Sequence, residues 1–460
     1  MKATICYHDI GDYQTREQKL ERVKGFGSVA NMKDTFRVIQ PNKHNDWIDH
    51  RDEGFEELIQ LAPTEKFNVN TQSFFTIHSS GTVTSRDAWV YSSSKDTLVA
   101  NIQRTLDFYE IWRKKLTELT NEKRALPSES LDASKISWSR ALRKDVEKGH
   151  SYSFDAASIH VAIYRPFFKQ NFYFNRALNE MPCLMSRLFP TTKHENLLIC
   201  MSGLGMPKDF SVLITEVLPD FQLMPNGQCF PLYYYEKNEH TQQLNLFGKT
   251  QEHIRRDGIS DFILKRAIEQ YGSKVTKEDI FYYVYGILHN EEYRKKYAVN
   301  LRKSLPRLPL LEPKLFRAFS KAGRELADLH LNYETQPPCG VAEEHSRKAT
   351  PSYRVTKMRF AKHQEQNEED KAVIVYNDDI SVIKIPLEAY EYIVNGKSAI
   401  EWVMERYQVT THKESGIIND PNLWCDEHSD PRYIIDLLKR VIALSLETMK
   451  IVKSLPKLEL

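Results

Sequence analysis

The sequence predicts an α+β fold, in which a β-rich module is followed by a helical layer and a small C-terminal α/β segment. Two observations favour this fold class. Short apolar and aromatic runs, separated by Pro, Asn and Gly, concentrate in residues 151–250 and are typical of strands and turns. Apolar residues at helical spacing dominate residues 251–335 and return near the C-terminus. At roughly 150 residues per domain, the 460 residues suffice for about two or three packed units.

The N-terminal part of the chain divides into a connector and a mixed segment. Residues 1–60 hold a short apolar run, Ala3–Tyr7, and then a charged stretch that is compatible with a helix, so we expect a connector without its own core. In residues 61–150, the part from Lys66 to Ser92 is rich in Thr, Ser, Val and aromatics, which favours strands joined by a turn. Helical spacing then predicts a helix over Lys95–Leu119.

Residues 151–250 supply the strands of the expected β-rich module. Each candidate strand is a short apolar or aromatic run bounded by turn residues. The runs are HVAIYRPFF (160–168), QNFYFN (170–175), ENLLICMS (195–202), FSVLIT (210–215) and CFPLYYYE (229–236). Runs of this length predict a compact module built from several small strands.

The rest of the chain predicts helices, loops and a closing segment. Residues 251–335 are dominated by helix formers. Residues 336–370 are polar and broken, which indicates loops on either side of a short strand at Tyr353–Phe360. Residues 371–460 begin with strand-like alternation and end in a strongly amphipathic helix, Tyr433–Leu455.

The composition is that of an ordinary soluble globular protein. Apolar residues make up 41% and charged residues 27% of the chain, and the net charge of +2 does not by itself indicate a polyanionic partner. The N-terminus lacks the apolar segment of a secretory signal, and no run approaches the ~18 apolar residues of a membrane span. We therefore expect a cytoplasmic protein without a membrane partner.

The cysteines predict neither a disulfide framework nor a metal site. All six are scattered without C-x-x-C spacing. Cys425 and His428 are close in sequence, but two ligands do not complete a structural zinc site. We expect reduced cysteines and no bound metal.

Motifs for nucleotide and cofactor binding are incomplete. Gly396-Lys397-Ser398 is preceded by Glu391 at the position where a phosphate-binding loop requires Gly, so a turn explains it. Ser202–Gly205 is too short for the Gly-rich turn of a doubly wound fold. We therefore expect no bound cofactor.

Catalytic motifs are incomplete as well. Methylation of a base amine needs an Asn/Asp-Pro-Pro-aromatic loop, but Pro337-Pro338 is flanked by Gln336 and Cys339. Metal-dependent DNA cleavage needs clustered carboxylates with a lysine, and Glu369–Lys371 has no suitably spaced upstream Pro-Asp. No G-x-S-x-G elbow for acyl transfer is present. The sequence therefore favours a binding protein, and we expect no catalytic residue.

One block of sequence resembles a known family. Ser79–Tyr91 (SSGTVTSRDAWVY) is similar to the segment that follows the methyltransferase core in Type ISP restriction-modification enzymes, single chains that translocate, methylate and cut DNA. Further blocks resemble the same family, in its order, over nearly the whole chain. They are YHDIGDY (7–13) with Arg16–Leu20, Pro41-Asn42 with Asp46–Ile48, YRPF (164–167), QCFPLY (228–233), DIFYYVYGILH (279–289), Tyr293-Arg294, LPRLP (305–309), KMRF (357–360), NGKSAIEW (395–402), ERY (405–407) and SGIINDPNLW (415–424).

The resemblance implies that the chain corresponds to the target-recognition region of that family. Residues 151–250 would then be a β-rich recognition module, and residues 1–60 a connector from a methyltransferase-like end. Such a region would read an asymmetric site in double-stranded DNA. It would position an adenine-N6 methyltransferase and helicase and nuclease modules, its partners in cis or in trans. Their catalytic parts have no counterpart here, so we expect either an excised fragment or a separate specificity subunit.

The Ser79–Tyr91 block supplies the first candidate DNA contacts. Base edges are read in the major groove by side chains that form paired hydrogen bonds, while phosphate contacts set the register. A cluster that follows a Gly-containing turn is able to grip the backbone or a base, or instead to hold the turn through an Arg86–Asp87 network. The candidates are Thr84, Ser85, Arg86, Asp87 and Trp89.

Two further candidates, Arg165 and Lys169, border an aromatic cluster. Stacking serves mainly unpaired bases, so we expect these aromatics in the core and only the polar residues beside them at a DNA surface. The aromatic residues are Phe167, Phe168, Phe172 and Tyr173.

Residues 294–307 hold six basic residues and no acidic one. A run of this kind is often only a solvated helix face, but it is also the electrostatic pattern of phosphate contact. The predicted phosphate contacts are Lys295, Lys296, Arg302, Lys303 and Arg307.

Two other functions stay open at this point. The helical layer and the C-terminal helix would suit a protein-interaction or assembly subunit that docks a methyltransferase or an ATPase and has little DNA affinity of its own. An enzyme with an unrecognised active site is the third alternative. Sequence selection from a pool of duplexes and a methyl-transfer assay separate the three.

Overall fold

The computed structural model describes residues 3–119, 125–206, 208–238, 252–363 and 368–459. The chain forms two compact units, Met1–Glu57 and Leu58–Leu460. The second unit contains mixed helices and small sheets, so the predicted α+β class is confirmed.

The N-terminal unit is small and has few buried residues. Strand β1 (Ile5–Tyr7) pairs antiparallel with β2 (Arg37–Ile39), and helix α1 (Arg16–Phe26) lies between them in sequence. A capping box at Thr15 begins α1, but no residue of this helix is buried. Two 3₁₀ turns complete the unit, η1 (Val29–Thr35) and η2 (Glu53–Glu57).

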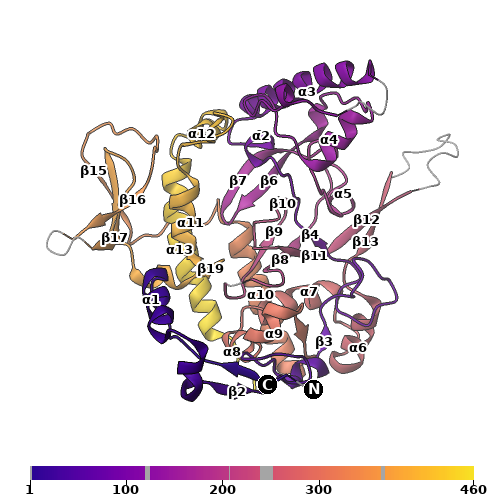
Figure 1. Ribbon diagram of the computed structural model, residues 1–460, viewed down its shortest axis with the longest axis vertical. Helices are drawn as coiled ribbons and strands as arrows, with labels where there is room; N and C mark the ends of the chain where they lie inside the picture. The colour runs from indigo at the N-terminus through magenta and orange to yellow at the C-terminus, as the bar shows by residue number, and fades with distance from the viewer. Residues whose placement is uncertain (1–2, 120–124, 207, 239–251, 364–367, 460) are drawn as a thin grey trace. The chain divides into compact units, whose positions relative to one another are not determined.

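Two four-stranded sheets form the centre of the second unit (Figure 1). The first has the order β10-β6-β7-β5, in which β6 and β7 form a hairpin and β10 joins β6 in parallel. Its strands are β5 (Tyr91–Ser92), β6 (Ile159–Arg165), β7 (Phe168–Tyr173) and β10 (Leu218–Pro219). The second has the order β4-β11-β8-β9, with β4 (Ser79–Ser80), β8 (Leu198–Met201), β9 (Val212–Thr215) and β11 (Gln228–Pro231).

Helix α3 (Lys95–Thr117) confirms the helix predicted over Lys95–Leu119. Ser94 caps its N-terminus by accepting a hydrogen bond from the Thr97 backbone. One face of α3 is buried and packs against β7 and α4 (Arg140–Glu147). Two one-turn helices, α2 (Asp87–Val90) and α5 (Met185–Leu188), complete this part.

A two-stranded antiparallel ribbon extends from the second sheet. It consists of β12 (Tyr233–Lys237) and β13 (His253–Asp257), and it projects from the body of the unit in Figure 1. The candidate strand CFPLYYYE (229–236) therefore splits into β11 and β12.

The predicted helical layer is present, and its central helices approach closely. A Cβ at Gly286 of α7 would lie 2.2 Å from the Phe319 carbonyl oxygen, and one at Gly323 of α10 would lie 1.8 Å from that of Tyr282. Glycine is required at both positions because the two backbones leave no room for a methyl group. The layer contains α6 (Asp261–Tyr271), α7 (Lys277–Ile287), α8 (Glu291–Lys296), α9 (Ala298–Lys303) and α10 (Pro313–Leu331). Between α9 and α10, the short strand β14 (Arg307–Leu308) pairs antiparallel with β3 (Ile59–Gln60).

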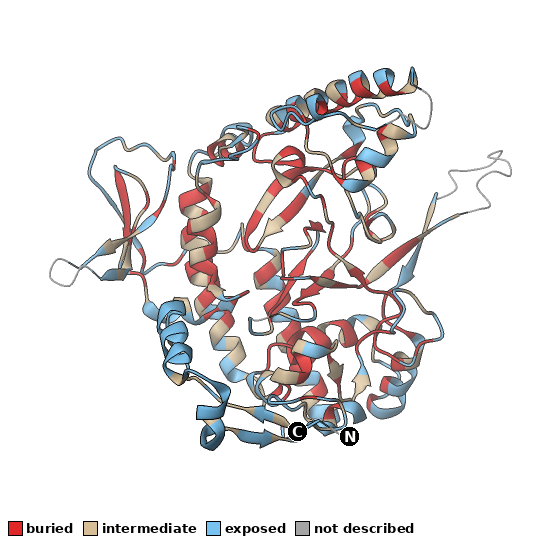
Figure 2. Ribbon diagram, viewed as in Figure 1, coloured by how far each residue is buried: buried red, intermediate tan, exposed pale blue. Residues whose placement is uncertain are grey.

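The C-terminal part closes the second unit. A four-stranded sheet has the order β15-β18-β17-β16, and the long helix α13 (Tyr433–Ser454) confirms the predicted amphipathic helix. Figure 2 shows that α13 is buried along much of its length. The other elements are β15 (Glu343–Ser346), β16 (Arg359–Lys362), β17 (Glu369–Val375), β18 (Ile380–Ile383), η7 (Leu387–Glu391), β19 (Ile393–Val394), β20 (Lys397–Ser398), α11 (Ala399–Arg406), β21 (Thr410–Thr411), β22 (Ile418–Asn419) and α12 (Asn422–Glu427).

The strand predicted at Tyr353–Phe360 was placed too early, because the structure has β16 at Arg359–Lys362. The backbone before β16 is held by side chains instead of a strand ladder. Tyr376 donates its hydroxyl to the Tyr353 carbonyl at 2.6 Å, and Asn377 donates to the Arg354 carbonyl at 2.9 Å. Side-chain bonds of this kind satisfy backbone groups without a neighbouring strand.

All six cysteines are free. Cys200 and Cys229 face each other on β8 and β11 with their Sγ atoms 3.4 Å apart. No helix in the described ranges is long and apolar enough to cross a membrane.

Candidate nucleic-acid interface

The first group of predicted DNA contacts lies at the start of α2. Thr84 Oγ1 accepts a hydrogen bond from the Arg86 backbone at 3.1 Å and donates to the Asp87 carboxylate. Thr84, Arg86 and Trp89 are buried, Asp87 is half-buried and Ser85 is exposed. The group therefore offers Ser85 and one edge of Asp87 to solvent.

Arg86 connects distant parts of the chain. Its Nε donates to the Ser137 carbonyl at 3.1 Å, and its Nη2 donates to Ser139 Oγ at 2.7 Å. Ser139 is also the N-cap of α4. Burial lowers the pKa of Arg86 to about 10. No direct hydrogen bond or ion pair between the side chains of these two described residues, Arg86 and Asp87, is present. The Arg86 side chain therefore holds α4, and only the Arg86 backbone is connected to Asp87, through Thr84.

Asp87 belongs to a second buried network, which is centred on Asp220. Arg165 Nη1 donates to Asp220 Oδ1 at 2.7 Å, and its Nη2 lies 3.7 Å from Asp87 Oδ2. Tyr164 donates its hydroxyl to Asp87 at 2.9 Å, and Tyr91 donates to Asp220 at 3.2 Å. Burial raises the pKa of Asp220 to about 7, against the opposing effect of the Arg165 charge. The Arg165 side chain is therefore engaged in a buried ion pair that stabilises the fold.

Lys169 is likewise paired inside the protein. Its Nζ donates to Glu334 Oε2 at 2.6 Å and lies 3.8 Å from Glu216 Oε1. Glu334 also accepts the hydroxyl of Tyr433, so the pair connects β7 to α13. The aromatics beside it are confirmed as core, since Phe167, Phe168, Phe172 and Tyr173 are all buried.

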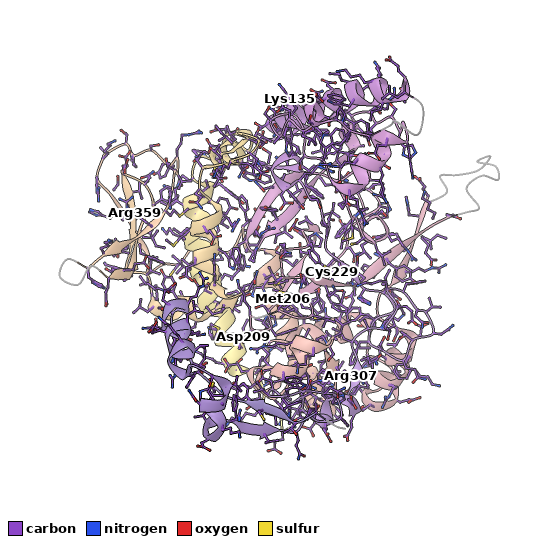
Figure 3. The ribbon with its side chains drawn as sticks, in the orientation of Figure 1. Lys135, Met206, Asp209, Cys229, Arg307 and Arg359 are labelled. Carbon is purple, nitrogen blue, oxygen red and sulfur yellow. The ribbon has the colours of Figure 1, made fainter. Side chains whose placement is uncertain are left out.

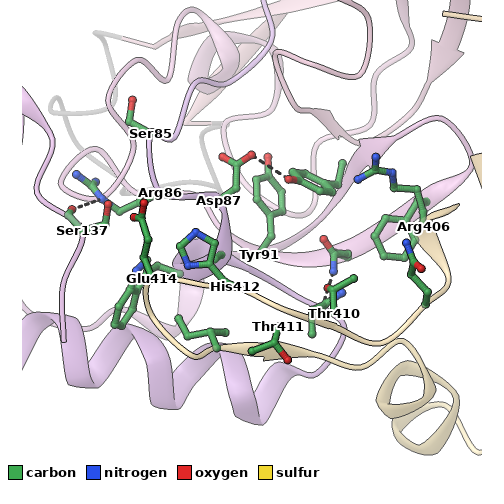
Figure 4. Close-up of a pocket in the computed structure, with 18 of the residues that line it drawn as sticks. Ser85, Arg86, Asp87, Tyr91, Ser137, Arg406, Thr410, Thr411, His412 and Glu414 are labelled. Atoms are coloured by element: carbon green, nitrogen blue, oxygen red, sulfur yellow. Dashed lines mark hydrogen bonds between the residues drawn. The ribbon is translucent and has the colours of Figure 1, made fainter. Parts of the chain in front are cut away.

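A cavity of about 720 Å³ opens beside α2 (Figure 4). The predicted residues Ser85, Arg86, Asp87 and Trp89 line one side of it. The facing side is formed by the C-terminal segment 405–419, which carries Thr410, Thr411 and His412 in Figure 4. Its walls mix aromatic rings, amides and both signs of charge, which is a suitable chemistry for polar recognition.

The basic segment lies on α8, α9 and β14. Lys295, Lys296 and Lys303 are exposed, and Arg302 and Arg307 are half-buried. Arg302 Nη2 lies 3.3 Å from Asp209 Oδ1, and Arg307 Nη1 donates to the Leu58 carbonyl at 3.2 Å; Figure 3 labels Asp209 and Arg307. This segment therefore has three exposed lysines and two half-buried arginines that form contacts within the fold.

Comparison with known proteins assigns the chain to a family. The family described as the Type ISP C-terminal specificity domain matches residues 73–437. The chain belongs to this family. No curated protein is significantly similar to the chain.

Solved structures resemble this specificity domain over its whole length. The ATP-dependent Type ISP restriction-modification enzyme LlaBIII, bound to DNA, is 33% identical with a TM-score of 0.86, covering 100% of this chain and 28% of that one. A nuclease-deletion mutant of the Type ISP enzyme LlaGI, in complex with a DNA substrate mimic, is 37% identical with a TM-score of 0.83, covering 99% and 39%. The DrdV–DNA complex is 29% identical with a TM-score of 0.82, covering 99% and 44%. The chain thus spans less than half the length of each.

Sequence reasoning missed two features of the specificity domain. The first is Asp220, whose only signal is a carboxylate in a largely apolar stretch, residues 212–224, which also contains Glu216. The second is the C-terminal side of the cavity, which lies more than 300 residues from Ser85 and has no local signal beyond the family-like blocks at 405–407 and 415–424. In the described ranges, no group of three or more His, Cys, Asp or Glu side chains is arranged to hold a metal ion.

Proposed function

We propose that this chain recognises a specific sequence in double-stranded DNA on behalf of a Type ISP-like restriction-modification enzyme. It would position an adenine-N6 methyltransferase and a translocase-nuclease, supplied in cis or in trans, and would itself be non-catalytic. The observation that carries the proposal is the match of a specificity domain over residues 73–437. The likeness over the full chain to two Type ISP enzymes that were solved with DNA or a DNA mimic adds support.

The predicted contacts divide into two classes under this proposal. Ser85, with Asp87 beside it, would contact DNA at the edge of the cavity, because Ser85 is exposed there. Thr84, Arg86 and Trp89 would support that rim from within, because their burial leaves little surface for a base. Arg165 and Lys169 would act in the same indirect way, through the ion pairs that hold β6 and β7.

Lys295, Lys296, Arg302, Lys303 and Arg307 are proposed to contact phosphates. Such contacts are independent of sequence and weaken as salt rises, because binding releases condensed counterions. Lys295 is exposed and has no carboxylate partner among the described residues, so it is the cleanest residue for a test.

The function is tested by selecting duplexes from a random pool, with and without a cognate methyltransferase, and by measuring the affinity of the selected duplex at low salt. We expect one sequence to be enriched. The proposal is wrong if no sequence is preferred and binding does not exceed that of a control protein. Co-purification with a methyltransferase, combined with unmeasurable DNA binding by the chain alone, would indicate the assembly function instead.

A substitution of Lys295 by Ala tests the phosphate contacts. We expect affinity to fall equally for selected and random duplexes, and the slope of log affinity against log salt to decrease by about 1. Lys321 on α10, also exposed, is the control, and its substitution by Ala should leave the slope unchanged. A change in sequence preference with Lys295→Ala would contradict a phosphate role.

A further inference from the structure

The β12–β13 ribbon has two chemically different faces. Directly opposed residues of an antiparallel pair lie on the same face. The pairing Tyr235 with Arg255 and Lys237 with His253 therefore defines one face, and the pairing Tyr234 with Arg256 defines the other.

The Tyr234 face holds the ribbon to the body of the unit. Tyr234 is buried and packs edge-on against Phe67, with ring centroids 5.4 Å apart. Arg256 Nε lies 3.1 Å from Glu236 Oε2 on the same face, and Arg187 lies 3.8 Å from the other oxygen of this carboxylate. The two charged residues of the ribbon on this face, Arg256 and Glu236, are thus paired with each other.

The Tyr235 face borders a groove of about 1390 Å³. Tyr235 anchors its floor, since its hydroxyl donates to the Glu195 carbonyl at 2.7 Å and its ring lies 4.6 Å from that of His194. Arg255 and His253 line the groove from the ribbon. The ribbon therefore forms one wall of an open groove.

The facing wall comes from the end of β7 and from the segment before β8. It carries Arg176 and Lys193, which are both exposed. Neither these two cations nor Arg255 has a carboxylate partner among the described residues, although Glu195 and Glu252 also line the groove. Arg255 instead forms a cation–π contact with Tyr233, in which its Cζ lies 4.3 Å from the centroid of the ring.

These features match the chemistry of duplex DNA. A two-stranded ribbon, with strands ~4.8 Å apart, fits the ~12 Å major groove. An arginine fork pairs with the two acceptors of guanine, and a glutamate accepts from the cytosine amine, so a groove with unpaired donors and acceptors suits base edges. Arg86, Arg165 and Lys169 are engaged inside the fold, and base readout therefore requires other side chains.

We propose that the Tyr235 face of the β12–β13 ribbon enters the major groove, where Arg255 reads a base edge, while Arg176 and Lys193 on the facing wall contact flanking phosphates. This inference rests on the proposed DNA-recognition function and adds to it the reading element and its residues.

The test uses the full chain and a labelled duplex recovered by selection with the unaltered chain. Arg255→Ala should reduce the preference for the selected duplex over single-base variants at one position by about 5- to 150-fold, as loss of a bidentate pair does. Arg255→Lys should keep most of the affinity and lose the same preference, because an ammonium has no planar fork. Arg176→Ala and Lys193→Ala should weaken all duplexes alike and lower the salt slope by about 1 each.

Arg256→Ala is the matched control, since Arg256 is the exposed neighbour of Arg255 on the opposite face. Thermal unfolding of each variant establishes that it is folded. The inference is overturned if Arg255→Ala and Arg255→Lys are both folded and keep the base preference, or if Arg256→Ala loses it to the same extent. If the unaltered chain prefers no sequence, the proposed function fails instead, and the two failures are distinguishable.

Discussion

Arg86 shows how one buried cation organises several segments at the residue scale. It joins the loop before α2 to Ser137 and to the N-cap of α4, two sites about 50 residues away in sequence. A buried guanidinium keeps its charge only when hydrogen bonds replace its water, so these bonds are strong constraints on the surrounding fold.

Arg86→Ala should lower the free energy of unfolding by about 2–4 kcal/mol, because the Ser137 carbonyl and the Ser139 hydroxyl lose a charged donor. Urea unfolding monitored by circular dichroism measures this change. Arg140→Ala, at an exposed position on α4, is the control and should change stability by less than about 0.5 kcal/mol. Equal effects of the two substitutions would show that Arg86 does not hold α4.

Asp220 gives the fold a pH dependence. Its pKa rises from 3.8 to about 7 on folding, so the folded chain binds this proton more tightly than the unfolded chain does. The stability that this tighter proton binding contributes to the folded chain is therefore fully present below pH 4 and is lost as pH rises towards 7.

We expect Asp220→Asn to reduce the loss of stability with rising pH. The Asp220 contribution to this loss is at most ~1.4 kcal/mol of unfolding free energy per pH unit between pH 4 and pH 7. The measurement is urea unfolding of both chains from pH 4 to pH 8. The difference between them isolates Asp220 from the buried histidines, whose lowered pKa values act in the opposite sense. A constant difference across this pH range would contradict the raised pKa.

At the scale of elements, local periodicity and long-range pairing differ in how far they can be predicted. The helices α3 and α13 are predictable because the spacing of their apolar residues is contained within each segment. The pairing of β4 with β11 joins residues about 150 positions apart, and the parallel pairing of β10 with β6 depends on their packing. Neither has a signal within one segment. For the same reason, the sequence could name Arg86 but not its partners.

The contact between α7 and α10 depends on two glycines that face each other. Gly323→Ala should destabilise the chain by about 1–3 kcal/mol, since the added methyl group meets the Tyr282 carbonyl and the helices must separate. Thermal unfolding measures the change. Lys321→Ala, at an exposed position two residues before Gly323 on the same helix, should be close to neutral. If Gly323→Ala is as stable as the unaltered chain, the two backbones are not in close contact.

At the scale of the whole molecule, the boundary at residue 57 separates the second unit, which contains the main hydrophobic cluster, from the N-terminal unit, which contributes no residue to that cluster. Every residue of the main hydrophobic cluster lies between Ile77 and Leu444, and α1 buries no side chain. The pattern of apolar runs predicts the fold class, and the family-like blocks imply the specificity role. They could not separate buried from exposed cations, because burial is decided by the three-dimensional packing of distant segments.

A chain of residues 58–460 should therefore retain the main unfolding transition and the near-UV circular dichroism of the full chain. Retention of this transition is expected because the truncation removes no residue of the main cluster. A broad transition with loss of the near-UV signal would show that the N-terminal unit is part of the same folding unit.

The free cysteines also allow local opening of the fold to be followed by thiol alkylation. Cys6 is exposed and Cys183 is partly accessible, whereas the other four cysteines are buried. Cys200 and Cys229 lie together in the second sheet, and Cys339 and Cys425 lie in the C-terminal part of the second unit. Burial raises the pKa of Cys200 and Cys425, which further slows their reaction with thiol reagents. The order in which the four buried thiols become alkylated would thus report, without any introduced label, whether the second sheet or the C-terminal helices open first.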